Sequence, residues 1–233
     1  MDDPNRANLE SIVRSLGEMN DELVYVGGVI AGLLITDSAA ATIRATKDVD
    51  CIIDVSTRSD YDTRVRSLLL ERGFSEMIGE GIPICAWEKE GLRLDVMPTD
   101  DSLGFTNPWY RGAIDNSNQL EISERIIKII SSPYFLATKF AAFQSRGQDD
   151  YWTSHDLEDI IAVIDGRPEI VSEVSSADAE VKRFLTSELN SLLSQDDFLQ
   201  VLPGFVLDEG RGPIVLERIR SMVEGRSDSA LYL

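Results

Sequence analysis

The segment from Asp48 to Val55 most constrains the fold, because it has the composition of a buried β-strand and yet opens with two aspartates. Side chains alternate between the two faces of a strand, so Asp48 and Asp50 project from the same face, about 6.5 to 7 Å apart along the backbone. The apolar side chains of Val49 and Cys51 point to the opposite face. Two acids at the start of an apolar strand cost free energy unless a cation neutralises them. The spacing therefore favours a divalent ion held by oxygen, and magnesium suits such a site.

A glycine pair precedes this strand, between a strand predicted over residues 23–26 and a helix predicted over residues 29–35. At such a turn, backbone N–H groups can bind phosphate oxygens, and a side chain at Gly27 or Gly28 would block close approach. Taken alone, a glycine pair is more often a packing device. An Asp-x-Asp pair alone is likewise often a turn or a solvated edge. Their combination has few purely structural explanations.

A hairpin further along the chain supplies a third acid. Its two predicted strands, residues 82–88 and 92–97, are joined by a turn that contains glycine. In the second strand Asp95 shares its face with Arg93 and Met97. If this strand neighbours the one that carries the aspartate pair, the three carboxylates can hold two metal ions about 3.5 to 4 Å apart, as in many phosphoryl-transfer sites. Asp95 could also help to deprotonate an attacking hydroxyl.

The predicted elements form two lobes and an α+β fold. Residues 1–131 combine the strands above with a helix over residues 61–72, which gives a small mixed sheet with helices on one side. For residues 122–130 a strand and a short helix remain equally open. From residue 132 to residue 233 the pattern is helical, beginning at Ser132-Pro133. Helices are predicted over residues 134–146, 154–165, about 169–194, and 213–224.

Charge and cysteine content narrow the functional classes. The 233 residues include 22 Lys and Arg against 41 Asp and Glu, a formal charge of −19, so nucleic-acid binding would need a local basic patch. A group of C-terminal arginines is the candidate, although a solvated helix face is the simpler interpretation: Arg211, Arg218, Arg220 and Arg226. With one His and two separated cysteines, Cys51 and Cys85, the chain lacks the ligands of a thiolate zinc site.

Nothing in the sequence predicts a membrane span or export. The longest apolar stretch, residues 24–35, falls short of the about 20 residues that a transmembrane helix needs. The acidic, polar N-terminus has no basic region followed by an apolar one. We therefore expect a cytoplasmic protein whose cysteines are buried free thiols.

Three motifs resemble those of the polymerase-β-type nucleotidyltransferase superfamily: VGGVIAGLL (residues 26–34), RATKDVDCII (residues 44–53) and LRLDVMPT (residues 92–99). The glycine pair and the Arg-x-Thr-x-Asp-Val-Asp form are most similar to AbiEii/MenT-type toxin nucleotidyltransferases. The resemblance covers residues 23–100 well and residues 133–165 moderately. It implies a nucleotidyltransferase lobe, residues 1–131, followed by a helical domain, residues 132–233. It also implies magnesium-dependent transfer of a nucleoside monophosphate from an NTP, and the three carboxylates lead us to expect two Mg²⁺ ions.

The same resemblance implies roles for individual residues: Asp48, Asp50 and Asp95 as catalytic metal ligands, and Gly27, Gly28, Thr46, Lys139 and Asp156 at the nucleotide. Gly28 stands where many nucleotidyltransferases have Ser, so a hydroxyl contact to phosphate is absent. Lys139, one of five lysines, lies in an otherwise apolar helix, where a phosphate partner and a snorkelling side chain are both reasonable. Asp156 could instead complete a capping box with Thr153.

These predictions leave several functions open. The leading hypothesis is a magnesium-dependent nucleotidyltransferase, with tRNA as the acceptor if it acts like the toxin relatives and an antitoxin protein as a possible partner. A small cationic acceptor, such as an aminoglycoside, fits the acidic charge better. The alternatives outside this enzyme class are a nucleotidyltransferase-like module that binds a partner without turnover and an unrelated acidic α+β protein.

Overall fold

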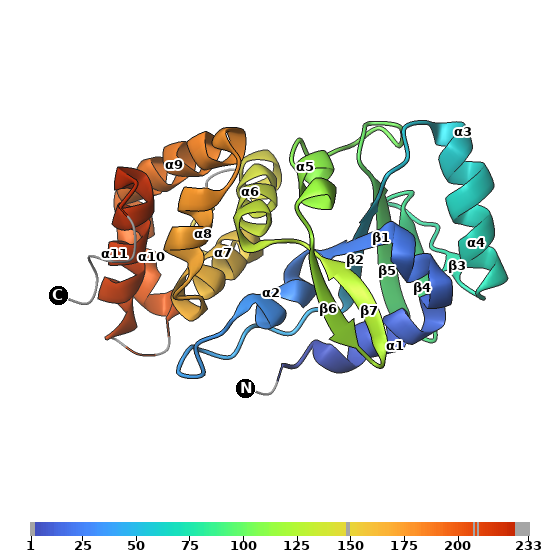
Figure 1. Cartoon of the computed structure of the whole chain (residues 1–233), viewed down its shortest axis with the longest axis horizontal. Helices are drawn as coiled ribbons and strands as arrows, with labels where there is room; N and C mark the ends of the chain where they lie inside the picture. Colours follow the sequence, from blue (N-terminus) through green and yellow to red (C-terminus); the bar gives the residue numbers. More distant parts are fainter. Residues whose placement is uncertain (1–2, 148–149, 207, 209, 227–233) are drawn as a thin grey trace. The chain divides into compact units, whose positions relative to one another are not determined.

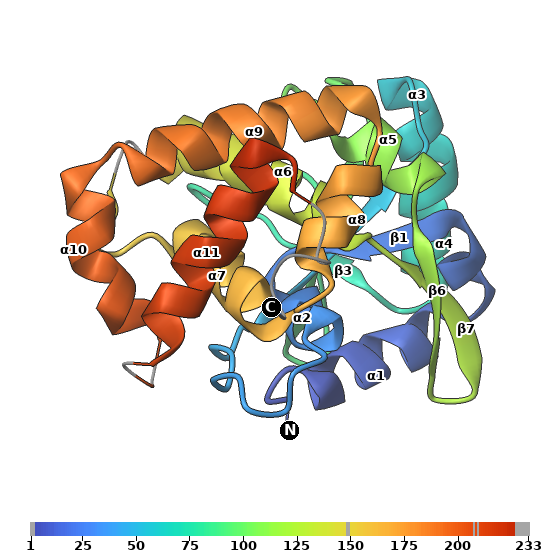
Figure 2. The ribbon, with the colours of Figure 1, turned by 60° about the vertical axis from the view of Figure 1, so that its left-hand side comes forward.

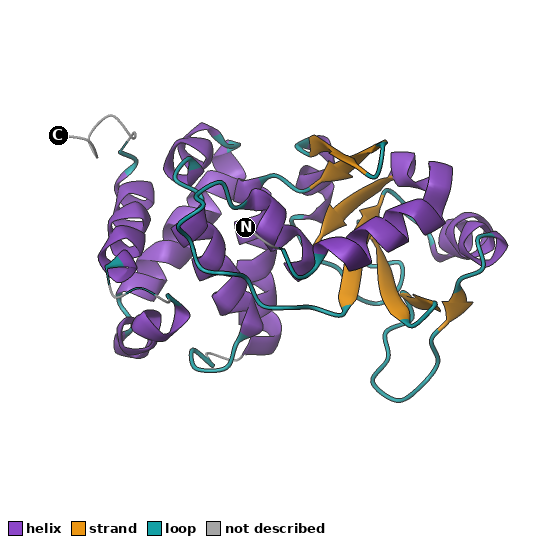
Figure 3. Ribbon diagram, turned by 90° about the horizontal axis from the view of Figure 1, so that it is seen from below, coloured by secondary structure: helices purple, strands orange, loops and turns teal. Residues whose placement is uncertain are grey.

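The computed structural model describes residues 3–147, 150–206, 208 and 210–226, which fold as two units (Figure 1). The sheet unit consists of residues 3–30 and 44–131, and the helical unit consists of residues 31–43 and the described chain from Ser132 onward. Helix α2 (Gly28–Leu34) begins in the sheet unit and ends in the helical unit. The strands of the described chain all belong to the sheet unit (Figure 3).

The strands form one mixed seven-stranded sheet in the order β3-β4-β5-β2-β1-β7-β6. Strand β2 is antiparallel to β1 and parallel to β5, and β7 is parallel to β1. This arrangement confirms the predicted α+β class with a mixed sheet. The strands are β1 Leu23–Val26, β2 Asp48–Ile53, β3 Ser75–Glu76, β4 Ala86–Lys89, β5 Leu92–Pro98, β6 Asn118–Ile122 and β7 Arg125–Ile129.

The predicted hairpin forms between β4 and β5. Its loop is the pair Glu90-Gly91, with φ values of +55° and +78°, which is the left-handed conformation that two-residue hairpin turns require. The first strand begins at Ala86 and not at residue 82 as predicted, because the chain turns before it. Pro83 lies in this turn and has no N–H to donate to a ladder.

Residues 122–130, which the sequence left undetermined, belong to a second hairpin, β6–β7. Its two-residue loop, Ser123-Glu124, has φ values of +50° and +63°. Such turns favour Gly, Asn or Asp, so a Ser-Glu pair gives no sequence signal for one.

Helices cover the apolar face of the sheet. Tyr25, Cys51 and Val96 share this face and are completely buried. Helix α1 contacts β2 and β5, and the hydroxyl of Tyr61 donates a hydrogen bond to the carbonyl oxygen of Val96 at 2.9 Å. The helical segments of this unit are α1 Arg6–Leu16, η1 Gly17–Glu22, α3 Arg58–Asp60, η2 Tyr61–Val65, α4 Arg66–Glu71 and α5 Tyr110–Asp115. The consecutive α3, η2 and α4 confirm the helix predicted over residues 61–72 and begin it at residue 58.

The helical unit is built around α9, which packs against α6 and α11 (Figure 2). The buried side chains of α9 recur at helical spacing: Val181, Leu185, Leu189 and Leu192. The helical segments are α6 Ser132–Ala142, η3 Phe143–Gly147, α7 His155–Gly166, α8 Ile170–Ser176, α9 Ala179–Leu193, α10 Asp196–Phe205 and α11 Arg211–Glu224. No helix among the described residues is long and apolar enough to cross a membrane.

One helix prediction in this unit is wrong, and one helix was missed. The single helix predicted over residues 169–194 is two helices, because Ala177 and Asp178 adopt extended ψ angles of 166° and 143°. The carboxylate of Asp178 accepts a hydrogen bond of 2.8 Å from the hydroxyl of Tyr134. Helix α10 was not predicted, and it contains Pro203, a residue that normally argues against a helix interior.

Candidate functional site

The three predicted metal ligands lie on one face of the sheet. Strands β2 and β5 are parallel neighbours, with Asp50 in register with Asp95 and Asp48 in register with Arg93. Register partners of neighbouring strands point to the same face, with the strands about 4.8 Å apart. Asp95 is buried, with 8% of its surface exposed, and the other two aspartates are half-buried. The parallel pairing of β2 and β5 therefore places Asp95 on the same sheet face as Asp48 and Asp50, from which it is distant in the sequence.

Gly27 lies directly against Asp50. Its φ of +73° belongs to the left-handed region that favours glycine, and a Cβ at this position would come within 2.0 Å of Oδ2 of Asp50. Val26, the residue before it, is in register with Asp50 across β1 and β2. The absence of a side chain at Gly27 thus leaves the space that the Asp50 carboxylate occupies. Gly28 is buried as the first residue of α2.

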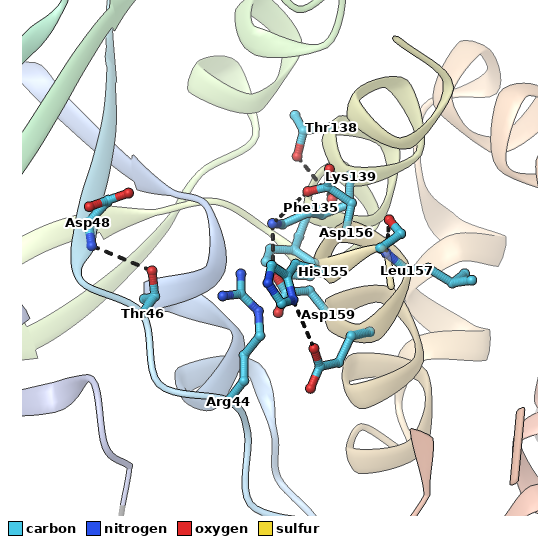
Figure 4. Close-up of polar contacts among 12 residues, drawn as sticks. Arg44, Thr46, Asp48, Phe135, Thr138, Lys139, His155, Asp156, Leu157 and Asp159 are labelled. Carbon is cyan, nitrogen blue, oxygen red and sulfur yellow. Dashed lines mark hydrogen bonds and ion pairs between the residues drawn. The ribbon is translucent and has the colours of Figure 1, made fainter. Parts of the chain in front are cut away.

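Asn5, which the sequence analysis missed, anchors the segment that leads into β2. Its buried side chain donates a hydrogen bond to the carbonyl oxygen of Arg44 at 3.1 Å and accepts one from the backbone N–H of Thr46 at 2.7 Å. The Thr46 hydroxyl accepts a hydrogen bond of 3.5 Å from the backbone N–H of Asp48 (Figure 4). Because Asn5 precedes α1, its type suggests only a helix cap. Its hydrogen bonds to Arg44 and Thr46, which lie 39 and 41 residues further along the chain, cannot be predicted from the neighbouring sequence.

Arg93 forms a bidentate ion pair with Asp95. Nε and Nη2 of Arg93 donate hydrogen bonds of 2.8 and 2.7 Å to the two carboxylate oxygens. The hydrogen bonds to Asp95 raise the pKa of the guanidinium above its ordinary value, burial opposes this, and the negative charges of Asp95, Asp48 and Asp50 raise it further. The sequence placed Arg93 on the same face as Asp95 but assigned it no role.

The donor chemistry of this face suits magnesium, but the three carboxylates are not arranged as a ready-made cluster. Three aspartates supply the hard oxygen ligands that magnesium prefers, and Gly27 leaves room for Asp50. Within the described part of the chain, no three His, Cys, Asp or Glu side chains are grouped so that they could hold one ion. At Asp95, both carboxylate oxygens accept hydrogen bonds from Arg93. The residues therefore fit the ion in type, and Asp95 is the ligand whose present partner would have to change.

Lys139 lies in a buried ion-pair network of the helical unit (Figure 4). Its Nζ is 3.0 Å from Oδ1 of Asp156 and 2.6 Å from Oδ2 of Asp159. Arg146 adds a bidentate pair to Asp156, with two hydrogen bonds of 2.9 Å. The network accounts for the burial of Lys139 without a ligand, so the structure by itself does not require a phosphate partner there.

Asp159 and Arg146 are the members of this network that the sequence did not reveal. Asp159 belongs to α7. It lies three residues after Asp156 on α7, a spacing that places two side chains on neighbouring positions of one helix surface. The N-cap of α7 is Ser154, whose hydroxyl accepts a hydrogen bond of 3.3 Å from the backbone N–H of Leu157, so the alternative of a capping role for Asp156 is wrong.

Asp156 and Lys139 stabilise each other in their charged forms. Burial by itself would lower the pKa of the Lys139 ammonium, but the charges of Asp159 and Asp156 outweigh it and raise this pKa above its ordinary value. Burial would likewise raise the pKa of Asp156, but the hydrogen bonds from Arg146 and the charge of Lys139 lower it. Lys139 and Asp156 are therefore both charged at neutral pH.

Two of the four C-terminal arginines of the candidate basic patch have structural roles. Arg211 pairs with Asp165 and Asp37, both at 2.7 Å, and 11% of its side chain is exposed. Arg218 donates a hydrogen bond of 2.8 Å to the carbonyl oxygen of Ile164. Their engagement leaves only Arg220 and Arg226 of the four arginines exposed.

The mixed sheet followed by helices is a nucleotidyltransferase-like fold. Among solved structures, the chain is similar to an antigenic nucleotidyltransferase-like protein from Paracoccidioides brasiliensis, with 23% sequence identity and a TM-score of 0.53 over 83% of this chain and 91% of that one. This identity is low enough that the likeness is one of fold alone. No protein-family model and no curated protein matches the chain.

Two further solved structures have lower TM-scores and add nothing to the fold assignment. The antibiotic-resistance factor ANT(2'')-Ia is 14% identical, with a TM-score of 0.49 over 81% of this chain and 95% of that one. JHP933 from Helicobacter pylori is 11% identical, with a TM-score of 0.48 over 94% of this chain and 92% of that one.

Proposed function

We propose that this protein is a magnesium-dependent nucleotidyltransferase that transfers a nucleoside monophosphate from an NTP to an acceptor hydroxyl. One observation carries the proposal: Asp48, Asp50 and Asp95 share a face of two adjacent strands in a nucleotidyltransferase-like fold. An unrelated acidic protein would have no need for three carboxylates on one face of a sheet, where they repel one another.

In the proposed reaction, the acceptor oxygen forms a bond to the α-phosphorus, the bond from that phosphorus to the bridging oxygen breaks, and pyrophosphate leaves. The proton of the acceptor passes to a carboxylate, for which Asp95 is the candidate. Magnesium, when bound, would neutralise charge on the phosphate oxygens. Asp48 and Asp50 would hold it, and the backbone around Gly27, Gly28 and Thr46 would lie along the triphosphate. Catalysis of this kind is mostly alignment and charge stabilisation.

Lys139 and Asp156 keep their proposed place at the nucleotide on the strength of the family resemblance alone. Their ion pair in the helical unit makes a test possible. Lys139→Arg retains the positive charge, so a loss of NTP affinity without a loss of folding stability would support direct contact with the nucleotide. Unchanged NTP affinity would assign Lys139 to the ion-pair network only.

For the acceptor we propose tRNA, as the similarity to AbiEii/MenT-type toxins suggests, with an antitoxin as the partner. A cationic small molecule is the second candidate, which the charge of −19 favours because an acidic surface attracts cations and repels a phosphate backbone. Binding to tRNA should weaken steeply as salt is added, because counterions are released from the phosphates. Binding that changes little with salt would argue for the small acceptor.

The proposal is tested by incubating the protein with each labelled NTP, magnesium and cell extract, and asking which molecule becomes labelled. Asp48→Asn with Asp50→Asn should abolish labelling while circular dichroism shows an intact fold. The matched control is Asp60→Asn with Asp62→Asn, an equally spaced pair in the α3–η2 segment with the same charge change. Undiminished labelling by the Asp48/Asp50 double variant would refute the assignment. Calorimetric binding of an NTP without any product would favour a non-catalytic binding module.

A further inference from the structure

Arg93 is a cation placed among the proposed metal ligands. Its hydrogen bonds engage both oxygens of Asp95, at 2.8 and 2.7 Å. Its register partner on β2 is Asp48, and the register partner of Asp95 is Asp50. Arg93 therefore stands beside two of the three aspartates on the same sheet face, and its charge interacts with all three.

The Arg93–Asp95 pair is better shielded from water than comparable pairs of the sheet unit. The exposed fractions of its side chains are 28% and 11%, whereas those of the bidentate pair of Arg66 and Glu76 are 46% and 33%. Bidentate arginine–carboxylate pairs are among the strongest hydrogen-bonded contacts, and removal from solvent strengthens them further. Arg93 is thus a strong competitor for the Asp95 carboxylate.

We propose that Arg93 is the internal counterion of this acidic face: it neutralises Asp95 in the cation-free protein and must release Asp95 before a divalent cation can use that carboxylate. The inference rests on the proposed function, since it takes the three aspartates as ligands of a divalent ion. Two consequences follow. Arg93 weakens divalent cation binding, and it stabilises the protein when no such cation is bound.

The test compares Mn²⁺ binding, measured by the electron paramagnetic resonance signal of free Mn²⁺, in the wild type, Arg93→Gln and Arg66→Gln. Both variants lose one positive charge and one bidentate ion pair, but only Arg93 lies on the acidic face. Arg93→Gln should bind Mn²⁺ about tenfold more tightly than the wild type, equivalent to about 1.4 kcal/mol. The Mn²⁺ affinity of Arg66→Gln should stay within about twofold of the wild-type affinity, because only a small long-range charge effect remains.

Thermal unfolding gives a second readout that needs no enzymatic activity. In the presence of a chelator, Arg93→Gln should melt below the wild type, and Mn²⁺ should raise its melting temperature by more than it raises that of the wild type. If Arg93→Gln fails to fold, Arg93→Lys keeps the charge but cannot form the bidentate pair. We expect its Mn²⁺ affinity to lie above that of the wild type.

The outcomes separate this inference from the proposed function. Equal or weaker Mn²⁺ binding by both Arg93 variants, with wild-type binding that depends on Asp48 and Asp50, would overturn the counterion role and leave the proposed function standing. An absence of Mn²⁺ binding in the wild type and in both Arg93 variants would overturn both. Tighter binding by the Arg93 variants, abolished by the additional change Asp50→Asn, would support both.

Discussion

Replacing Lys139 by Met removes the ammonium from a network of buried carboxylates while nearly preserving side-chain length. At an effective dielectric constant of about 20, unit charges separated by the observed 2.6 and 3.0 Å attract each other by about 6 kcal/mol in each pair. Desolvation of the ions offsets much of this, and breaking a buried ion pair by removing one partner costs about 3 to 5 kcal/mol. We expect Lys139→Met to lower the free energy of unfolding by about 3 to 4 kcal/mol, because Arg146 continues to pair with Asp156.

Urea denaturation followed by far-ultraviolet circular dichroism measures this loss in the free energy of unfolding. The exposed Lys47 provides the control, since Lys47→Met removes the same charge and should change stability by less than about 0.5 kcal/mol. Adding Asp159→Asn to Lys139→Met should restore part of the lost stability, because it removes a buried negative charge that has lost its ion pair with Lys139. A loss below about 1 kcal/mol for Lys139→Met, or no recovery in the double variant, would refute the reasoning.

Two further predictions concern the carboxylates. Gly27→Ala and Gly91→Ala both place a side chain at positive φ, which costs about 1 to 2 kcal/mol of folding stability. Only at Gly27 would the new Cβ meet Asp50. Gly27→Ala should therefore also weaken Mn²⁺ binding, whereas Gly91→Ala should not. Equal Mn²⁺ affinities of the two variants would contradict the described contact. For Asp156, the lowered pKa means that its contribution to stability is present above the ordinary value of 3.8 and is lost as the pH falls through the folded-state pKa. The difference in unfolding free energy between the wild type and Asp156→Asn should therefore shrink as the pH drops below about 3.8, and a constant difference would show that the charge of Asp156 is not what stabilises the fold.

Periodicity and turn chemistry sufficed to predict the local elements whose signals are strong. The apolar run of β2, the glycine-containing turn between β4 and β5, and the helical spacing that leads to α6, α7 and α11 all have local causes, and the structure has these elements near the predicted bounds. The failures also have local causes. The turn at Ser123-Glu124 uses residues that do not favour positive φ, and the last turn of α10 contains a Pro-Gly pair that argues against a helix.

In the candidate site, some features have local causes in the sequence and others depend on residues far apart in the chain. Alternation along β2 was enough to place Asp48 and Asp50 on one face, because the period of a strand is a property of the backbone. Nothing in the sequence could show that Asn5 holds the segment before β2, or that Arg93 takes both oxygens of Asp95. These contacts depend on side-chain conformations that are chosen only when the surrounding elements have packed.

By itself, the sequence determined the strands and helices with strong local signals, the faces of those strands and the acidic character of one of them, since each follows from the order of neighbouring residues. Only the tertiary structure decided that β5 lies beside β2, that residues 31–43 join the helical unit, and that Asp159 shares Lys139 with Asp156. The physical reason is that these associations depend on burial and charge balance among groups far apart in the chain. Their free energy is not encoded in any local pattern.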